Sequence, residues 1–164
     1  MHLTLTKELD IIGATFSFLS TLFYMAASRW AWPVSLIAIS INMVLYTKTG
    51  LFADVFKESI YAVSCMIGWY WWRRGGKHQK ALAISNLSLK HSAILSIAAL
   101  LSTLALSTVL IKWTSSQVPY WDATTTILSL TAQWLICRKI IECWILWGIV
   151  DGLYAGLYFH KAIP

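Results

Sequence analysis

Residues 92–111, with the sequence SAILSIAALLSTLALSTVLI, form an uncharged run of 20 positions. An α-helix needs about 20 predominantly apolar residues to cross a hydrocarbon core of about 30 Å. This run therefore predicts one membrane-spanning helix, and it is the strongest candidate in the chain for a helix that faces lipid.

The rest of the chain repeats this pattern less uniformly. Two uncharged runs of 18 residues, 11–28 and 30–47, come first. The next run, 59–72, is too short to cross a bilayer at about 1.5 Å per residue, so its helix must start near Leu51 and include several charged residues. The six predicted spans are residues 11–28, 30–47, 51–72, 92–111, 123–137 and 143–159.

The composition supports a membrane protein and argues against a soluble enzyme. Hydrophobic residues make up 58% of the 164 positions and charged residues 12%, whereas a soluble domain has about 25% charged residues. We expect an all-α polytopic protein with a single membrane domain over residues 1–164. The net charge of +6 lies in the loops, which is typical of membrane orientation signals rather than of nucleic-acid binding.

The distribution of Lys and Arg over the loops predicts the orientation. If the long loop after the third span is cytoplasmic, eight of these residues lie inside and four outside. By the positive-inside rule this places the N-terminus outside.

The two halves of the chain resemble each other weakly. One helix ends in LYTKTGLF at residues 45–52, and the last span ends in LYFHKAIP at residues 157–164. We expect a first three-helix repeat at 7–72, a connecting helix at 92–112 and an incomplete second repeat at 121–164. These are six helices of a 3+1+3 parallel-repeat bundle, an arrangement used by transporters, from which a seventh helix is missing.

Polar and aromatic residues recur at steps of three and four in three spans, which places them on one face of each helix. Acidic groups at membrane depth are costly unless they face a cavity or a partner, so these faces predict a pathway for a substrate or an ion. Carboxylates beside aromatic rings suit a flat cationic ligand. The faces are Asp54, Glu58, Tyr61, Cys65, Gly68 and Trp72; Asp122, Thr125, Thr126, Ser129 and Gln133; and Trp144, Trp147, Asp151, Tyr154 and Tyr158.

Structural explanations compete for some of these residues. Asp54 and Lys57 stand three apart and can pair with each other, and Glu58 can pair with Lys48. The Ser and Thr hydroxyls of the fifth span can bond to their own helix.

Most tryptophans and the cysteines also have structural explanations. Near span ends, tryptophans suit an interfacial aromatic belt, and we expect the three cysteines to be reduced thiols that face lipid or pack. The belt candidates are Trp30, Trp32, Trp69, Trp71, Trp72, Trp113 and Trp121, and the cysteines are Cys65, Cys137 and Cys143.

Catalytic motifs are absent from the sequence. It contains no phosphate-binding loop, nucleophile elbow or metal-ligand spacing, so we expect no enzyme, no metal site and no cofactor. An intramembrane hydrolase with Asp122 and Asp151 as an acid pair is the enzymatic alternative, although the two residues lie on different helices.

Four segments carry a family resemblance: GLFAD at 50–54, GWYWW at 68–72, WD at 121–122 and RKIIECWILW at 138–147. Their order and spacing resemble the PnuC-like vitamin transporters, a family that includes nicotinamide riboside transporters and related thiamine carriers. The likeness covers nearly the whole chain. Its most specific element is the pair Trp144 and Trp147, which follows a basic turn and an acid.

The resemblance implies a seven-helix 3+1+3 fold like that of the SWEET sugar transporters. It also implies facilitated diffusion of an unphosphorylated vitamin, which cytoplasmic phosphorylation then traps. We expect nicotinamide riboside as the substrate; the alternatives are thiamine, or a truncated membrane subunit that does not transport. Glu58 stands where the family has glutamine, and Asp151 and Cys143 stand where asparagine is common. The predicted substrate-binding residues are Trp144, Trp147, Asp151, Glu58, Gln133, Tyr61, Tyr154 and Thr125.

The same resemblance implies the location and the partners. We expect a multi-pass protein of the cell (inner) membrane that works together with a cytoplasmic vitamin kinase. The lipid bilayer and the vitamin are the other predicted partners, nucleic acid is not, and association with a second copy of the chain in a homo-oligomer is left open.

Overall fold

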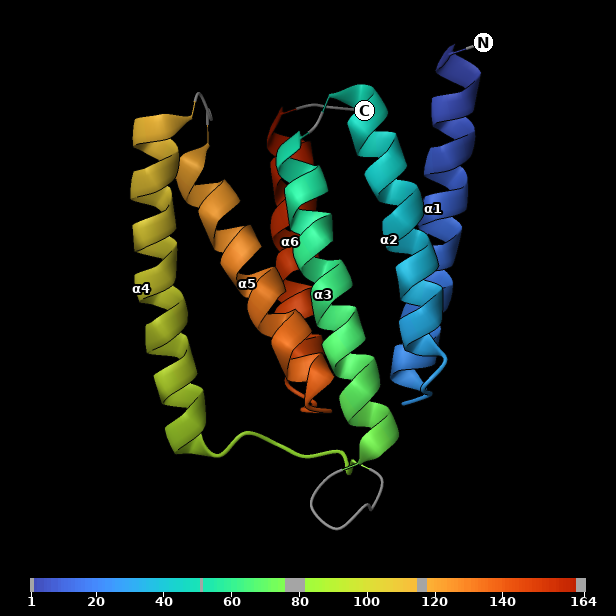
Figure 1. Cartoon of the computed structure of the whole chain (residues 1–164). Coiled ribbons are helices and arrows are strands. Elements are labelled where there is room, and N and C mark those ends of the chain that lie inside the picture. The colour runs from blue at the N-terminus through green and yellow to red at the C-terminus, as the bar shows by residue number, and fades with distance from the viewer. Residues whose placement is uncertain (1, 51, 76–81, 115–117, 162–164) are drawn as a thin grey trace. The chain divides into compact units, whose positions relative to one another are not determined.

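The computed structural model describes residues 2–50, 52–75, 82–114 and 118–161, and the regular elements in these segments are six α-helices (Figure 1). Each of the six predicted spans corresponds to a helix. The all-α prediction is therefore confirmed for the described residues. The helices are α1 (His2–Met25), α2 (Ala31–Thr49), α3 (Phe52–Arg74), α4 (Leu89–Trp113), α5 (Pro119–Cys137) and α6 (Cys143–Lys161).

The lengths of the helices suit a bilayer. They contain 19 to 25 residues, or about 28–38 Å at about 1.5 Å per residue. By length and apolar composition together, α4 alone among the described helices meets the requirement for a membrane span, and the apolar part of α6, Cys143–Gly156, is shorter. The other helices carry more polar and charged residues along their length.

The first helix extends well beyond its predicted span. It begins at His2 rather than at residue 11, because charged residues such as Lys7 and Asp10 do not interrupt a helix. They only mark the part of it that lies outside the hydrocarbon. The predicted start of α6 at Cys143 and end of α5 at Cys137 agree with the structure.

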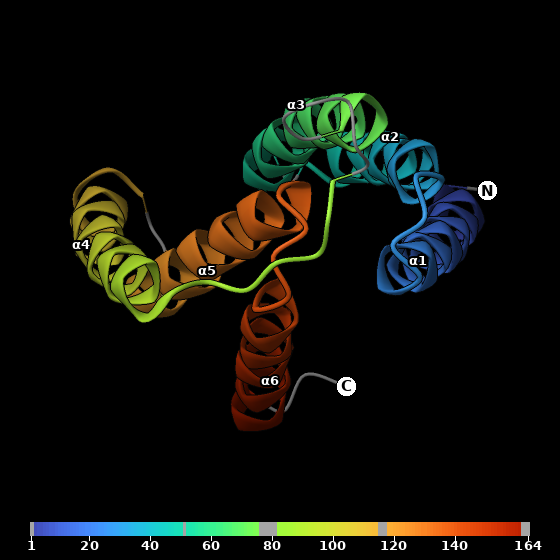
Figure 2. The ribbon, with the colours of Figure 1, turned by 90° about the horizontal axis from the view of Figure 1, so that it is seen from below.

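The chain divides into two compact units, which we call unit 1 (residues 1–83 with 137–139) and unit 2 (residues 84–136 with 140–164). In unit 1, α2 lies between α1 and α3 and contacts both (Figure 2). The α2–α3 connection is tight because Gly50 adopts a left-handed φ of 74° and its N–H bonds back to the end of α2.

Two close approaches hold α2 in this position. A side chain on Gly13 of α1 would collide with the Asn42 amide, and one on Gly68 of α3 would collide with the Trp32 indole. Each glycine therefore lets a neighbouring side chain lie directly against its helix backbone, as small residues do in membrane helix packing.

An aromatic cluster joins the three helices at the end of unit 1 where α2 begins. Tyr24, Trp32 and Trp72 meet edge to face, with ring centroids 5.0 to 6.1 Å apart. Trp32 is fully buried, and Trp72 is 8% exposed. The prediction that these two tryptophans belong to an interfacial belt is wrong, because both pack within the protein. Trp30 and Trp113, at 65% and 83% exposure, have the exposure that a belt requires.

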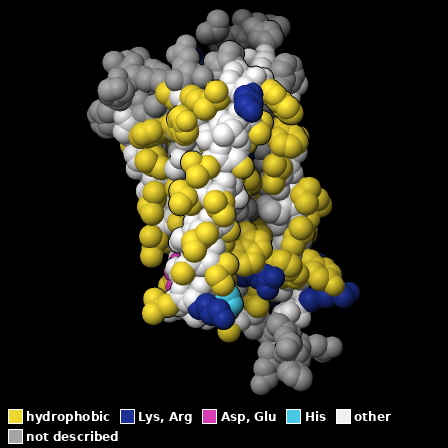
Figure 3. Space-filling view, turned by 90° about the vertical axis from the view of Figure 1, so that its left-hand side faces the viewer, with side chains coloured by type: hydrophobic (Ala, Val, Ile, Leu, Met, Phe, Trp, Pro, Cys, Tyr) yellow, Lys and Arg dark blue, Asp and Glu magenta, His cyan; other side chains and the backbone are white. Residues whose placement is uncertain are grey.

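In unit 2, α4 presents apolar side chains outward along its length. Figure 3, which looks onto the side of α4, shows hydrophobic side chains along the helix and basic ones near its ends. Ser107 is its buried residue, and its hydroxyl bonds to Leu104 O at 2.9 Å. The expectation that this span faces lipid is thus supported by exposed residues that include Ile94, Ile97, Leu100, Leu101, Leu104 and Val109.

The chain before α4 and the turn between α5 and α6 are tied together within unit 2. Ser85 O accepts from Ile141 N at 3.1 Å, and the Glu142 carboxylate accepts from Leu87 N at 2.9 Å. This pairing anchors the N-terminal approach to α4 at the start of α6. The three cysteines are free thiols and all are buried, so they pack rather than face lipid.

Candidate functional site

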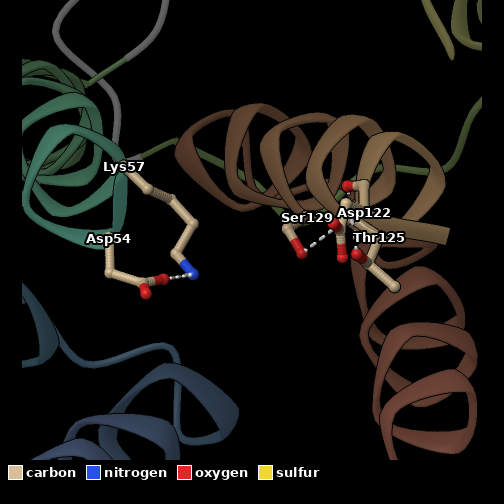
Figure 4. Close-up of polar contacts among 5 residues, drawn as sticks. All are labelled: Asp54, Lys57, Asp122, Thr125 and Ser129. Atoms are coloured by element: carbon tan, nitrogen blue, oxygen red, sulfur yellow. Dashed lines mark hydrogen bonds and ion pairs between the residues drawn. The ribbon is translucent and has the colours of Figure 1, made fainter. Parts of the chain in front are cut away.

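The predicted face of α3 divides into a polar part near the start of the helix and a packed part towards its end. In the polar part Asp54 and Lys57 form an ion pair of 2.7 Å (Figure 4), as the spacing suggested. Glu58 is 7% exposed and hydrogen-bonds the Asn42 side chain of α2, not Lys48 as the sequence left open. Tyr61, one turn further along, is half-buried.

The packed part of the α3 face points into unit 1. Cys65 Sγ lies 3.9 Å from the Tyr24 hydroxyl, which in turn accepts from Ser35 Oγ at 3.0 Å. Gly68 lies against Trp32. These contacts account for the second half of the stripe by helix packing, which leaves Glu58 and Tyr61 as the α3 residues with a candidate role in binding.

The polar face of α5 is buried along most of its length. Thr125, Ser129 and Gln133 are 2%, 4% and 9% exposed. Both hydroxyls bond within their own helix. Thr125 Oγ1 donates to Trp121 O at 3.0 Å, and Ser129 Oγ donates to Thr125 O at 2.7 Å (Figure 4). The self-bonding alternative is confirmed for these two residues, and the Gln133 side chain is buried on the same face.

Trp121 is a candidate that the sequence interpretation assigned to the belt. Its indole N–H is buried and has no hydrogen-bond partner among the described residues. It stands four positions before Thr125, so it lies on the same helix face, and this spacing was a signal available in the sequence. A buried donor without a partner is costly, so a ligand oxygen here would satisfy it.

The face of α6 differs from those of α3 and α5 because it is accessible. Trp144, Trp147 and Tyr154 are half-buried, and Asp151 is exposed. Asp151 makes no hydrogen bond or ion pair with any side chain in the described segments. A carboxylate at this depth is costly in lipid, and beside two indoles and a phenol it suits a cationic aromatic ligand.

The eight predicted site residues therefore fall into two groups. Glu58 and Tyr61 belong to unit 1, and the other six belong to α5 and α6 of unit 2. Tyr158, which the α6 pattern also included, lies outside the described side chains. Among the described residues there is no group of His, Cys, Asp or Glu that could hold a metal ion.

A comparison with protein families identifies what these helices belong to. The family model described as "Nicotinamide mononucleotide transporter" matches residues 7–164. The chain is 23% identical over 153 residues to "Nicotinamide riboside transporter PnuC" of Escherichia coli, covering 78% of this chain and 64% of the relative. It is 24% identical over 158 residues to "Riboflavin/roseoflavin transporter RibM" of Streptomyces davaonensis, covering 92% and 71%.

The fold has a counterpart among solved structures. The "Crystal structure of the Vitamin B3 transporter PnuC" matches with a TM-score of 0.72 at 19% identity, covering 96% of this chain and 74% of that one. The chain spans about two thirds to three quarters of the length of these relatives. The resemblance to PnuC-like transporters is confirmed, and those relatives are transporters rather than enzymes. The chain belongs to the nicotinamide mononucleotide transporter family.

Proposed function

We propose that this chain carries a flat aromatic vitamin across the cell (inner) membrane by facilitated diffusion, and that nicotinamide riboside is its first candidate substrate. The observation that carries the proposal is the family match over residues 7–164. The relative named for nicotinamide riboside transport and the vitamin B3 transporter with the same fold support it. A cytoplasmic kinase that phosphorylates the vitamin would trap it, because the charged phosphate cannot return through the same pathway.

The α6 face is the proposed centre of recognition. Trp144 and Trp147 would stack on the pyridine ring, and Asp151 would favour its fixed positive charge. Tyr154, on the same face, has a hydroxyl that can bond to the ribose. Gln133 and Thr125 of α5, and Glu58 and Tyr61 of α3, are the other proposed substrate-binding residues.

The proposed architecture is a 3+1+3 bundle in a membrane with the N-terminus outside. In it α1, α2 and α3 form the first repeat, α4 is the connecting helix, and α5 and α6 belong to the second. The outward apolar surface of α4 supports the connecting role. The excess of Lys and Arg in loops on one side supports the orientation.

A second candidate substrate is riboflavin. RibM is named as a riboflavin/roseoflavin transporter, and its match covers 92% of this chain. Riboflavin is flat and aromatic but has no fixed positive charge, so aromatic stacking without the Asp151 carboxylate would suffice for it. Thiamine, the alternative from the sequence, has a fixed positive charge like nicotinamide riboside.

The test is uptake into proteoliposomes that contain the purified chain, with nicotinamide riboside, riboflavin and thiamine as separate substrates. We expect saturable nicotinamide riboside uptake, and we expect Trp147→Ala to reduce it at least about tenfold, since a lost aromatic stack and cation–π contact together exceed about 1.4 kcal/mol. Trp113→Ala is the matched control, because Trp113 is 83% exposed at the end of α4. Equal uptake by the Trp147→Ala variant would remove the α6 site, and no saturable uptake of any of the three would remove the transport function.

A further inference from the structure

One end of unit 1 concentrates positive charge on aromatic rings. Four cations lie over four consecutive aromatic residues at the end of α3. Arg73 and Arg74 stand 5.8 and 4.9 Å from the ring centroids of Trp69 and Tyr70. The other two cations come from the turn after α5, where Arg138 is 4.6 Å from Trp71 and Lys139 is 4.4 Å from Trp72. We call these four residues, together with Arg29 after α1, the basic end.

The turn after α5 is held at the basic end by specific contacts. Trp72 Nε1 donates to Cys137 O at 3.2 Å, and the Cys137 thiol donates to Ser64 O at 3.4 Å. Lys139 adopts a left-handed φ of 55°, a conformation that L-residues other than glycine adopt only at a cost in energy. Two cations from a distant part of the sequence are thus fixed at the same end of α3 as Arg73 and Arg74.

Acidic residues of unit 1 do not balance this charge. In its described residues the acids are Glu8, Asp10, Asp54 and Glu58, which lie near the start of α1 or of α3. Glu58 is 15 residues before Arg73, or roughly 22 Å along the helix. Glu142, close in sequence to Lys139, belongs to unit 2, where it binds Leu87 N. The described acids of unit 1 therefore lie towards its other end, and the basic end carries a local excess of positive charge.

The side chains around the basic end indicate the kind of anion. Exposed apolar residues lie one to two turns inward from it: Met66 and Ile67 on α3 at 55% and 43% exposure, and Leu22 and Met25 on α1 at 45% and 66%. Cations thus lie at the end of the helices and apolar surface lies next to them. A ligand with an anionic head and hydrocarbon tails would match both. Guanidinium groups bind phosphate oxygens in a fork geometry, and basic clusters next to membrane helices bind anionic lipids.

We propose that the basic end of unit 1 binds the phosphate of an anionic phospholipid headgroup, with the acyl chains along α1 and α3. Arg73, Arg74 and Arg138 would each offer a guanidinium group to headgroup phosphate oxygens, and the rings beneath them would keep these groups oriented. The lipid would stabilise the docked turn after α5 by neutralising the cations gathered there. Burial also lowers the pKa of Lys139, and a phosphate nearby would favour its charged form.

The test measures lipid binding by native mass spectrometry of the purified full chain in detergent, titrated with dioleoylphosphatidylglycerol or dioleoylphosphatidylcholine. The double variant Arg138→Gln/Lys139→Gln is expected to bind phosphatidylglycerol roughly tenfold or more weakly, at about 1 kcal/mol per basic residue. Lys48→Gln/Lys112→Gln removes the same charge from exposed helix ends elsewhere and should change affinity less than about threefold. Arg138→Lys keeps the charge but loses the fork geometry, so it should weaken binding less than the double variant does.

Arg74→Gln protects the test against misfolding, because Arg74 is exposed and the contacts described for it are to Tyr70 alone. It should weaken phosphatidylglycerol binding severalfold. Unchanged affinity in both this variant and the double variant would overturn the proposal, as would equal binding of the two lipids by the parent chain. Glycerol 3-phosphate that displaces the lipid at similar concentration would also overturn it, in favour of a soluble phosphate ligand. No vitamin is present, so the result is independent of the transport proposal.

Discussion

Helices α2 and α6 have the same length and the same spacing of residues along one face, but the two faces differ in how far they are buried. Both contain 19 residues, and both follow a turn with a left-handed residue, Ala27 or Lys139. Their second, fifth, ninth and twelfth positions share one helix face. On α2 these positions are Trp32, Ser35, Ile39 and Asn42, and on α6 they are Trp144, Trp147, Asp151 and Tyr154.

On α2 the face is closed by protein. Trp32 is fully buried, and Ser35 and Ile39 are each 7% exposed, since α1 and α3 cover them. On α6 the same positions are half-buried or exposed, and no described atom lies within 4 Å of a side chain built on Gly148, Gly152 or Gly156. A tryptophan at the start of a helix is thus core where a neighbouring helix offers glycine, as Gly68 does for Trp32, whereas Trp144 stays half-buried among the described residues.

The largest expected difference is between the two tryptophans at the second position. Trp32→Ala should lower the free energy of unfolding by about 3 kcal/mol, near the low end for a buried aromatic because lipid already solvates apolar surface. Trp144→Ala should lower it by less than about 1 kcal/mol, since its ring is only half-buried. Thermal unfolding in detergent, followed by tryptophan fluorescence, measures both. Equal losses would show that the α6 face is also core.

Two glycine substitutions test the same difference in packing, because they add a side chain where the tryptophan variants remove one. Gly68→Leu should destabilise the fold by about 2 kcal/mol or more, because its side chain would collide with the buried Trp32 indole. A Cβ at Gly152 has no described atom within 4 Å, and leucine has the higher helix propensity, so Gly152→Leu should be neutral or slightly stabilising. The yield of monodisperse protein after extraction, with its unfolding midpoint, reports the difference. A tolerated Gly68→Leu would contradict the tight α2–α3 packing.

The sequence predicted where the helices lie in the chain better than it predicted the contacts between them. Apolar runs gave six helices because bilayer thickness sets their length, but the same runs could not mark where α1 begins in water. A buried Trp32 and a belt tryptophan look alike in sequence, because the difference depends on Gly68, a residue 36 positions away. The α6 stripe was predictable from spacing. The covering of Glu58 by Asn42 was not, since it depends on how α2 packs.

The next comparison is between Asn42, at the twelfth position of α2, and the residue at the same position of α6. Asn42→Ala should cost about 1–2 kcal/mol, because the buried Glu58 loses a hydrogen bond from its side chain. The cost should shrink when Glu58 is already glutamine, which a double-mutant cycle on unfolding measures. Tyr154→Ala, at the equivalent position of α6, should change stability by less than about 0.5 kcal/mol. Additive losses for the Asn42 and Glu58 variants would mean that the two residues act separately.

The smallest expected effect, and the most specific one, concerns Asp151 at the ninth position of α6. Asp151→Asn should weaken nicotinamide riboside binding roughly fivefold, because water and salt screen an exposed carboxylate from a cationic ring. Riboflavin has no fixed charge and should bind as before. Asp54→Asn, which removes a carboxylate paired with Lys57, is the matched control and should affect neither ligand. Titration of tryptophan fluorescence measures all three variants. A parallel loss for both vitamins would mean that Asp151 holds the helix in place, so α6 would then use its face as α2 does.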